Sequence, residues 1–403
     1  MQTTTLITLL TLACLVLVVY HHVGYPWLLA RWPRRSPSAH GVLARRGYVA
    51  RLGDRTLPAV TVIVPAHDEE TLIAEKVRNL AALDYPPSRL KVVIACDGCH
   101  DATAARARAA HAEPECQHLD LEVLEFAVNR GKVAVLNETI ASARGELIAL
   151  SDVSALVSID ALLRAASAFA DPQMGVVAGG YRLLAPGSAG ESAYWNYQLR
   201  IKRGEAALGA PLGTHGAFYL FRRRLFTPLA PDTINDDFLL PMSIVADGYR
   251  AIYDTEIMAL ELERADPVLD RCRRRRIAAG NLQQAWRLRR LLHPRHRGIA
   301  FAFASGKALR AVMPFLLLAT LAGSLWLAPQ SLPFALLATA QVLVYAVALW
   351  RQLNPRARVP GVVNTLHYLV GGHVAGLVGG VRYLVGLDRG HWRRATLTEE
   401  TSR

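Results

Sequence analysis

Apolar positions along this chain are gathered into blocks rather than spread evenly. Residues 1–30 and 311–350 contain no Lys, Arg, Asp or Glu, whereas the stretch from 58 to 290 has the mixed composition of a globular domain. A helix needs about 20 apolar residues to cross a bilayer. We therefore predict membrane spans at residues 3–22, 311–329 and 332–350. The glycine-rich apolar stretch 362–387 predicts a re-entrant segment or a third C-terminal span.

The first span is interpreted as a retained anchor. A cleaved signal peptide would have a basic start, a shorter apolar core and a small-residue cleavage site, and the sequence shows none of these. By the positive-inside rule, the arginines after the span place the N-terminus outside and the next domain in the cytoplasm. These arginines are Arg31, Arg34, Arg35, Arg45, Arg46 and Arg51. Further arginines in the tail predict a cytoplasmic C-terminus.

Between the apolar blocks, short β-branched runs alternate with segments of helical spacing. Such alternation is typical of βαβ units and predicts an α/β fold with a mostly parallel sheet. The predicted strands cover residues 59–64, 90–95, 121–126 and 147–150, and the predicted helices cover 69–82, 101–112 and 131–143. In sheets of this kind, ligands bind beyond the carboxyl ends of the strands.

The net charge of +13 is concentrated in one region. Ten arginines and no acidic residue lie between Arg271 and Arg297, directly before an apolar block. A basic run can bind nucleic acid, anionic lipid or a diphosphate group. Its position favours the last two, and no recognised nucleic-acid module accompanies it, so we expect no nucleic-acid partner.

Acidic residues occur where the predicted strands stop and again further along the chain. They are Asp68-Glu69, Asp97, Asp152 and Asp236-Asp237. Carboxylates that meet at one sheet edge repel one another unless a cation or hydrogen-bond donors are present. A divalent ion such as Mg²⁺, bound by one or two carboxylates and substrate phosphates, would resolve this repulsion. For Asp101, which stands at the start of a predicted helix, local capping is an equally simple interpretation.

Several motifs occur in an order that matches a known family. They are Val64-Pro65-Ala66-His67-Asp68-Glu69, Asp97-Gly98 with Asp101, Asn129-Arg130-Gly131-Lys132, Asp152, Gly213-Thr214-His215-Gly216, Asp236-Asp237 and Arg273-Arg274-Arg275-Arg276-Ile277. In these motifs the chain resembles the family 2 inverting glycosyltransferases with a GT-A fold. The resemblance is strongest to the membrane-embedded cellulose, hyaluronan and poly-N-acetylglucosamine synthases.

The resemblance implies a donor site, an acceptor site and a base. The donor nucleotide-sugar would be bound by Pro65, His67, Glu69, Asp97, Asp101, Lys132, Asp152 and Arg276. The acceptor side would be formed by Gly213, His215 and Gly216. Asp237, beside Asp236, would be the catalytic base that takes the proton of the acceptor hydroxyl. Asp152 would bind Mg²⁺ or Mn²⁺ together with the diphosphate, which Arg276 would clamp.

Two positions depart from the family pattern. Ser154 stands where the second acid of the DxD motif is expected. Arg273 and Ile277 replace the glutamine and tryptophan of the QxxRW motif. In the processive synthases that tryptophan lies against the acceptor sugar, so its replacement argues against processive polymer synthesis.

The implied organisation is an N-terminal anchor (1–28), a basic linker (29–57), a cytoplasmic GT-A domain (58–300), a C-terminal membrane region (301–388) and a cytoplasmic tail (389–403). The implied function is transfer of a sugar from a UDP-sugar to a polysaccharide or glycan at the cell membrane, in exopolysaccharide or cell-envelope synthesis. Partner subunits of a secretion complex stay an open option. The alternatives are transfer of one sugar to a lipid, such as a polyprenyl phosphate or glycolipid, and a non-catalytic glycosyltransferase-like subunit.

Overall fold

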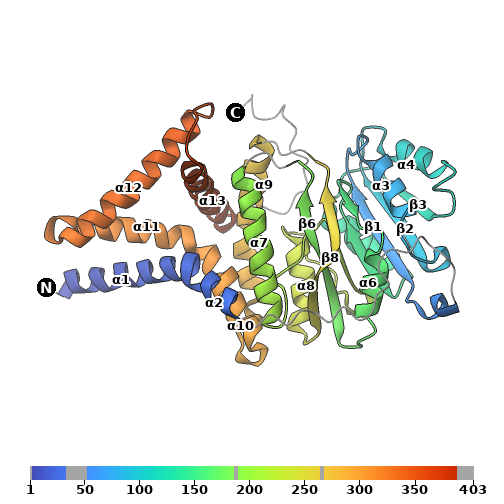
Figure 1. Ribbon diagram of the computed structural model, residues 1–403, viewed down its shortest axis with the longest axis horizontal. Coiled ribbons are helices and arrows are strands. Elements are labelled where there is room, and N and C mark those ends of the chain that lie inside the picture. Colours follow the sequence, from blue (N-terminus) through green and yellow to red (C-terminus); the bar gives the residue numbers. More distant parts are fainter. Residues whose placement is uncertain (1, 33–51, 186–188, 264–266, 388–403) are drawn as a thin grey trace.

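The computed structural model describes residues 2–32, 52–185, 189–263 and 267–387. Within these ranges the chain forms an α/β domain and a set of long apolar helices (Figure 1). Most of the predicted linker and its arginines, from Arg34 to Arg51, lie outside the described residues, as does the predicted tail 389–403.

An eight-stranded mixed sheet forms the centre of the α/β domain, in the order β3-β2-β1-β4-β7-β6-β8-β5. The first four strands in this order are parallel. Strand β7 is antiparallel to β4 and β6, and β8 is parallel to β6 but antiparallel to β5. The strands are β1 (Val60–Ala66), β2 (Leu90–Asp97), β3 (Asp120–Phe126), β4 (Leu147–Ser151), β5 (Ala155–Val157), β6 (Met174–Leu183), β7 (Phe218–Arg222) and β8 (Arg250–Glu261).

Strand β1 is buried on both faces, which explains its β-branched run. Val62 packs into a cluster with Ile73 of α3 (Ile73–Ala81), on one face of the sheet. Ile63 packs into the opposite cluster with Leu136 of α5 (Lys132–Ser142). Successive side chains of a strand point to opposite faces, so both faces need apolar residues here. The predicted α/β fold and the elements predicted up to residue 150 are confirmed within a few residues.

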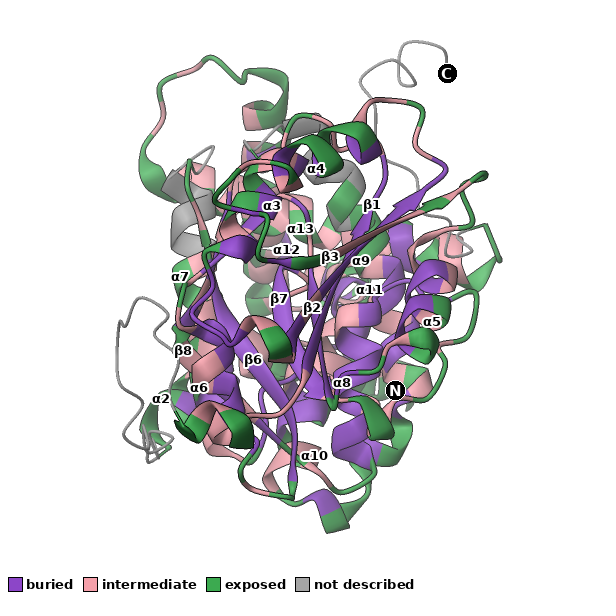
Figure 2. Ribbon diagram, turned by 90° about the vertical axis from the view of Figure 1, so that its right-hand side faces the viewer, coloured by how far each residue is buried: buried purple, intermediate pink, exposed green. Residues whose placement is uncertain are grey.

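Helices cover both faces of the sheet, with buried strands between them and exposed outer helix faces (Figure 2). The other helices of this domain are α4 (Thr103–His111), α6 (Ala161–Ala168), α7 (Ala189–Ala207), α8 (Asp236–Ala246) and α9 (Pro267–Arg287). Helices α7 and α9 stand between the sheet and the apolar helices (Figure 1). Short 3₁₀ helices are η2 (Leu52–Thr56), η3 (Pro87–Arg89), η4 (Arg223–Leu225), η5 (Arg289–Leu292) and η6 (Pro294–His296).

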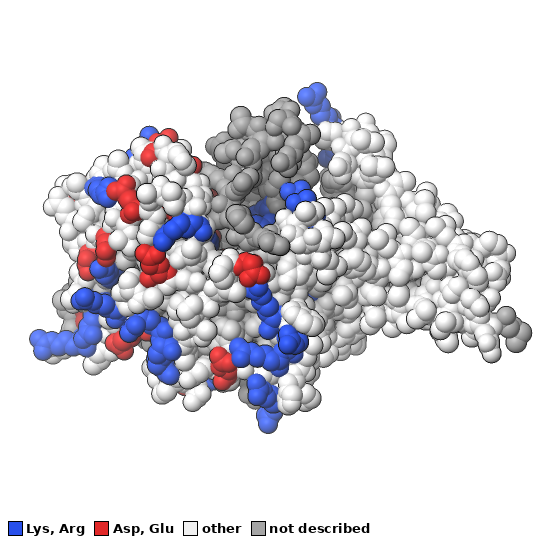
Figure 3. Space-filling view, turned by 180° about the vertical axis from the view of Figure 1, so that it is seen from behind, with Lys and Arg blue, Asp and Glu red and all other residues white. Residues whose placement is uncertain are grey.

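Three helices among the described residues are long and apolar enough to cross a membrane: Gln2–Arg31, Gly298–Gln330 and Leu332–Leu353. They contain the three predicted spans and indicate membrane association. Charged side chains are spread over the α/β domain and are scarce on these helices (Figure 3). Their parts are α1 (Gln2–Val19), η1 (Tyr20–Gly24), α2 (Tyr25–Arg31), α10 (Gly298–Ala302), η7 (Phe303–Ala308), α11 (Leu309–Leu327), η8 (Ala328–Gln330) and α12 (Leu332–Leu353).

The glycine-rich stretch near the C-terminus forms one continuous helix, α13 (Gly361–Leu384), which packs against α9. A Cβ at Gly379 would lie 2.3 Å from the backbone oxygen of Arg275. Small residues let helix backbones approach closely. Gly379 therefore serves helix packing, and the placement of α13 as a re-entrant segment or a further span stays a prediction.

Candidate active site

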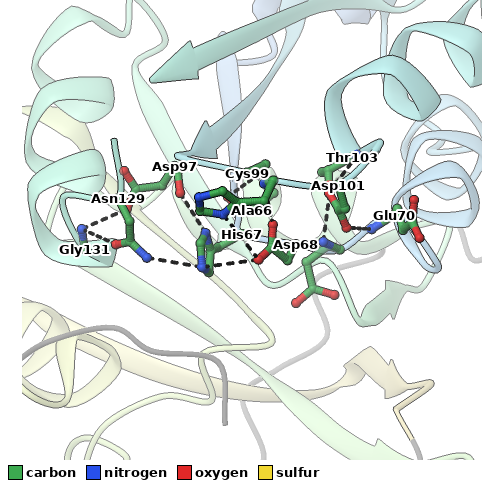
Figure 4. A network of polar contacts seen from close by, with 12 residues as sticks. Ala66, His67, Asp68, Glu70, Asp97, Cys99, Asp101, Thr103, Asn129 and Gly131 are labelled. Atoms are coloured by element: carbon green, nitrogen blue, oxygen red, sulfur yellow. Dashed lines mark hydrogen bonds and ion pairs between the residues drawn. The ribbon is translucent and has the colours of Figure 1, made fainter. Parts of the chain in front are cut away.

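The carboxylate of Asp97, at the end of β2, holds the loop that leads into α5. Its two oxygens accept hydrogen bonds from the backbone N–H groups of Arg130 (3.0 Å) and Gly131 (2.8 Å). His67, directly after β1, donates from Nδ1 to the backbone oxygen of Asp97 at 2.7 Å. Gly98 is required here, because a Cβ would lie 2.3 Å from the nitrogen of Asn129. Two strand ends and one loop are thereby fixed together (Figure 4).

Three other residues that were predicted to bind the donor nucleotide-sugar have structural partners in the same region. Pro65 is a buried residue of β1 itself. The backbone N–H of Glu69 donates to the hydroxyl of Thr103 at 2.8 Å. Asp101 accepts from the N–H groups of Glu70 (3.0 Å) and Thr103 (2.9 Å), so its carboxylate satisfies the first turn of α4. Contacts of these residues with a nucleotide stay predictions.

Lys132, the first residue of α5, links carboxylates from two other elements. Its ammonium donates to Asp152 Oδ1 at 2.9 Å and lies 3.7 Å from Asp236 Oδ2. Burial alone would lower the pKa of Lys132, but the carboxylates of Asp152 and Asp236 outweigh it and raise the pKa. Lys132 is therefore a fixed positive charge between the end of β4 and the start of α8.

Asp237 also lies near Asp152. A Cβ at Gly216 would lie 3.2 Å from Asp152 Oδ2 and 3.6 Å from Asp237 Oδ2, so both carboxylates flank this glycine. Thr214 donates to the backbone oxygen of Asp237 from its N–H (3.0 Å) and its hydroxyl (2.7 Å). The predicted base and the predicted acceptor-side turn are thus brought together. The structure unites Asp97, Lys132, Asp152, Asp236 and Asp237 in one connected site.

The pKa of Asp237 is raised by burial and then by repulsion from Asp236, which Lys132 offsets in part. A base acts only when deprotonated, so kcat/KM should fall as the pH drops through this raised pKa. Asp236→Asn removes the repulsion, and we expect the acid limb of the kcat/KM profile to move down by about one pH unit. The profile is measured at saturating divalent ion. Asp247→Asn is the control, because Asp247 is exposed and pairs with Arg290 at 2.8 Å. An acid limb that stays in place would contradict this account of Asp237.

His215 packs against aromatic rings. It stacks on Tyr181 with ring centroids 5.3 Å apart and meets Trp195 at 5.8 Å. Its Nε2 atom is buried and has no hydrogen-bond partner within the described ranges. Burial and the nearby Lys202 lower the pKa of His215 well below its ordinary value. The ring is therefore neutral near pH 7.

The oxygen atoms around Lys132 are of the kind that Mg²⁺ and Mn²⁺ bind. Asp152 contributes one oxygen that Lys132 does not use. Burial raises the pKa of Glu261 at the end of β8, and Ser154 lies close enough to Glu261 to offset this in part. Within the described ranges, the group of three possible metal ligands whose atoms lie within 4.8 Å of one another is His67, Asp68 and Cys99, on the predicted nucleotide side. The residues at Asp152 therefore fit an ion only in combination with donor phosphates and water.

Arg273 of the basic helix α9 is, like Arg276, an exposed residue, and it lies close enough to act on Asp152. Burial opposes ionisation of Asp152, yet Lys132 and then Arg273 lower its pKa. Arg276, the predicted diphosphate clamp, is exposed and makes no hydrogen bond or ion pair with another described residue. The two arginines are three residues apart and share one face of the helix. In the sequence, this three-residue spacing was the signal that Arg273 lies on the same helix face as Arg276. The family pattern shows Arg273 only as the replacement of a glutamine.

Arg273 and Arg276 offer a matched pair for testing which arginine serves the diphosphate. We expect Arg273→Met to raise KM for the donor or lower kcat/KM by about tenfold or more, since a charged hydrogen bond contributes about 1.5–3 kcal/mol. Arg276→Met should change these constants less. Steady-state kinetics with a varied nucleotide sugar provide the measurement. The reverse order of effects would restore Arg276 as the clamp.

A buried lysine behind Asp152 was not predicted. Lys76 of α3 donates to the hydroxyl of Ser151 at 2.6 Å and to the backbone oxygen of Ala155 at 2.5 Å. Burial lowers the pKa of Lys76 to about 7, although Asp152 and Glu261 raise it. The helical spacing places Lys76 on the apolar face of α3. An ionisable side chain on that face was the feature of the sequence that could have pointed to a buried lysine.

Comparisons with known proteins identify relatives of the α/β domain. The family model described as Glycosyltransferase like family 2 matches residues 58–280. The chain is 33% identical over 138 residues to the β-monoglucosyldiacylglycerol synthase of Trichormus variabilis, covering 34% of this chain and 29% of that protein. It is 26% identical over 206 residues to the poly-β-1,6-N-acetyl-D-glucosamine synthase of Staphylococcus aureus, covering 49% and 48%. Each match thus spans less than half of the relative's length.

One solved structure is similar over nearly the whole chain. It is a mannosyltransferase from Pyrobaculum calidifontis in complex with GDP-Man and Mn²⁺. The TM-score is 0.67 at 26% identity, and the alignment covers 91% of this chain and 99% of that one. The similarity therefore extends from the α/β domain into the apolar helices.

Proposed function

The chain belongs to family 2 of the glycosyltransferases, and from this premise we propose that it transfers one sugar, with inversion, from a nucleoside-diphosphate sugar to a lipid-linked acceptor at the membrane. The observation that carries the proposal is the position of Gly216, with the carboxylates of Asp152 and Asp237 on either side of it. One carboxylate belongs to the predicted donor side, and the other is the predicted base. Donor and acceptor would meet at this turn.

The donor side would be formed by Asp97, Lys132 and Asp152, with Arg273 from α9. The family resemblance implied a UDP-sugar, whereas the Pyrobaculum calidifontis mannosyltransferase was solved with GDP-Man. We therefore propose a nucleoside-diphosphate sugar as the donor, and we leave the identity of its nucleobase to experiment. Asp152, with the donor phosphates, would hold Mg²⁺ or Mn²⁺, which would neutralise charge on the diphosphate.

The chemistry follows from the charges around Gly216. The acceptor oxygen forms a bond to the anomeric carbon as the bond from that carbon to the diphosphate breaks. Asp237 takes the proton of an acceptor hydroxyl, and the nucleoside diphosphate leaves with the bonding electron pair. Lys132 and Arg273 would stabilise the negative charge that develops on the leaving group.

The acceptor side faces the apolar helices, which favours a lipid over a growing polymer. Lys202 of α7 donates to the backbone oxygens of Leu212 and Gly213, each at 3.0 Å. Lys307 of η7 lies 4.2 Å from the ring centroid of Phe238, the residue after Asp237. Elements at the membrane side thus hold the turn at which the acceptor would react. The cytoplasmic orientation, the cell-membrane location and any partner subunits remain part of the proposal.

Transfer by the purified chain in lipid nanodiscs tests this proposal. Radiolabelled UDP- and GDP-sugars are supplied with and without Mg²⁺ or Mn²⁺, together with a bacterial lipid extract. We expect label to enter the organic phase and to depend on the divalent ion. Label that precipitates as a large water-soluble polymer would support the polysaccharide alternative. The absence of transfer or donor hydrolysis with every nucleotide sugar would support a non-catalytic subunit.

A further inference from the structure

A histidine, an aspartate and a cysteine converge where strands β1 and β2 end, and they are different residues from the acids around Lys132. They are His67, Asp68 and Cys99, and each offers one possible ligand atom within 4.8 Å of the other two. They come from the loops that directly follow the two strands (Figure 4). His67 is buried, whereas Asp68 and Cys99 are partly exposed, so an ion can reach the group from solvent.

The ring of His67 is oriented as that of a metal-binding histidine. Its Nδ1 donates to the backbone oxygen of Asp97 at 2.7 Å. Histidines that bind metals usually donate their other ring N–H to a carbonyl or a carboxylate in this way. Because Nδ1 carries the proton, Nε2 has the lone pair, and it accepts a hydrogen bond from the side-chain nitrogen of Asn129 at 3.2 Å. An ion bound to Nε2 would replace that hydrogen bond.

Asp68 presents one carboxylate oxygen to this histidine. Its Oδ2 lies 3.6 Å from His67 Nε2, while its Oδ1 accepts from the backbone N–H of His100 at 2.8 Å. Zinc binds nitrogen, oxygen and sulfur at about 2.0–2.3 Å, so two ligands of a tetrahedral zinc ion lie about 3.3–3.8 Å apart. The separation between His67 Nε2 and Asp68 Oδ2 already falls within that range.

Cys99 completes the group and decides which ion fits it. Its thiol donates to the backbone oxygen of Ala66 at 3.6 Å, which holds the sulfur beside the end of β1. Mg²⁺ and Mn²⁺ prefer oxygen ligands, whereas a thiolate combined with an imidazole selects Zn²⁺. A thiolate and a carboxylate together balance the charge of a divalent ion. The fourth position is open to water or to the exposed ring of His100, whose Nδ1 lies 3.9 Å from Asp68 Oδ2.

We propose that His67 Nε2, Asp68 Oδ2 and Cys99 Sγ form a second metal site, which binds Zn²⁺ and thereby weakens binding of the donor. The bond from zinc to sulfur forms as the thiol proton, which Ala66 accepts in the free site, is released to solvent. This site is distinct from the one at Asp152, where the available ligands are oxygen atoms. Zinc binding needs no turnover, whereas its effect on the donor rests on the proposed function.

The effect on the donor follows from the hydrogen bonds of Asn129. Its side-chain nitrogen donates to His67 Nε2, and its side-chain oxygen accepts from the backbone N–H of Gly131 at 3.1 Å. Zinc at Nε2 displaces this amide and so loosens the loop between Asp97 and Lys132. These two residues belong to the proposed donor side, so occupation of the zinc site should oppose donor binding.

Cobalt substitution in the full chain tests the metal site directly. The chain, without a polyhistidine tag, is held in lipid nanodiscs, stripped with a chelator, reduced with a thiol-free reductant and titrated with Co²⁺ in excess Mg²⁺. A thiolate bound to Co²⁺ gives a sulfur-to-metal charge-transfer band. We expect this band in the wild-type chain, its loss when Zn²⁺ is added, and its absence from Cys99→Ala. No band in the reduced wild-type chain, or the same band in Cys99→Ala, would overturn the proposal.

Asp68→Asn is the second variant, because it removes a ligand and preserves the local fold. Asp68 has a φ of +52°, in the left-handed region that asparagine also adopts, and the amide oxygen can still accept from His100. We expect the Kd of Zn²⁺ to rise by at least about 10-fold, since loss of an outer-shell partner alone costs about 10- to 100-fold. Cys14→Ala, in the apolar helix α1, is the matched control for the loss of a thiol. Equal zinc affinity in the wild type and Asp68→Asn would refute the proposed ligand set.

Equilibrium binding of UDP and GDP, measured with and without Zn²⁺, tests the effect on the donor. Free Zn²⁺ is buffered at micromolar concentration in millimolar Mg²⁺, so that Mg²⁺ serves the diphosphate. At saturating Zn²⁺ we expect the Kd of the nucleotide that binds to rise about 3- to 10-fold in the wild type, the value of one neutral hydrogen bond, and to stay unchanged in Cys99→Ala. An equal rise in both proteins would place the zinc at Asp152 and refute the competition. Zinc binding without sugar transfer would count against the proposed function alone.

Discussion

Asp237→Asn should lower kcat by about 10²–10⁴-fold while the Kd of the donor changes little. The amide keeps the shape of the side chain but cannot accept the proton of an acceptor hydroxyl. The donor contacts assigned to Asp97, Lys132 and Asp152 do not depend on this group. Single-turnover transfer and equilibrium binding of the nucleoside diphosphate measure the two quantities separately.

The control for this variant lies at the other end of α8. Asp247 is exposed and pairs with Arg290 at 2.8 Å, so Asp247→Asn keeps normal turnover if the effect is specific. A variant at Asp237 that retains more than about a tenth of wild-type activity would exclude this residue as the base, because general bases contribute at least about 10²-fold. An acceptor that reacts through a fully ionised phosphate oxygen needs no base, so its transfer rate would also change little in Asp237→Asn. The variant therefore reports on the reacting acceptor atom as well.

The first half of the sheet could be predicted because its information is local. Strand β1 is buried on both faces, and its uninterrupted β-branched run follows directly from that burial. Each of the next three strands is likewise separated from its neighbour by a segment of helical spacing. The second half was not predicted. Strand β7 enters the sheet antiparallel to β4 from a distant part of the chain, and its pairing is set by tertiary contacts rather than by periodicity.

The grouping of the candidate site residues could be predicted for the same reason, whereas their roles stay predictions. Asp97 and Asp152 follow parallel strands, so one edge of one sheet brings them together. Family resemblance supplied Lys132, which donates to Asp152, and Asp237, which flanks Gly216 together with Asp152. The sequence did not reveal Lys307, because its closeness to Phe238 depends on how a distant apolar helix packs on the α/β domain. A basic residue beside an apolar block commonly contacts anionic lipid headgroups, so its place in the sequence does not assign it to a substrate.

Lys132→Met should be nearly as damaging as loss of the base, with a fall in kcat/KM of about 10²–10³-fold. The ammonium is the hydrogen-bonded positive charge between Asp152 and Asp236, and its removal leaves carboxylates of two elements facing one another. Repulsion would then raise the pKa of Asp237 further, so the acid limb of kcat/KM should also move to higher pH. This direction is opposite to the shift expected for Asp236→Asn.

That pair of opposite shifts makes the test of Lys132 stringent. A purely structural lysine would reduce the folded fraction and scale the whole pH profile without moving its limb. Lys132→Arg keeps the charge and should recover part of the rate and the wild-type limb position, although its planar group fits the two carboxylates differently. If Lys132→Met lowers activity and the limb stays in place, the lysine acts on the departing diphosphate alone, and the electrostatic link between the donor side and Asp237 is absent.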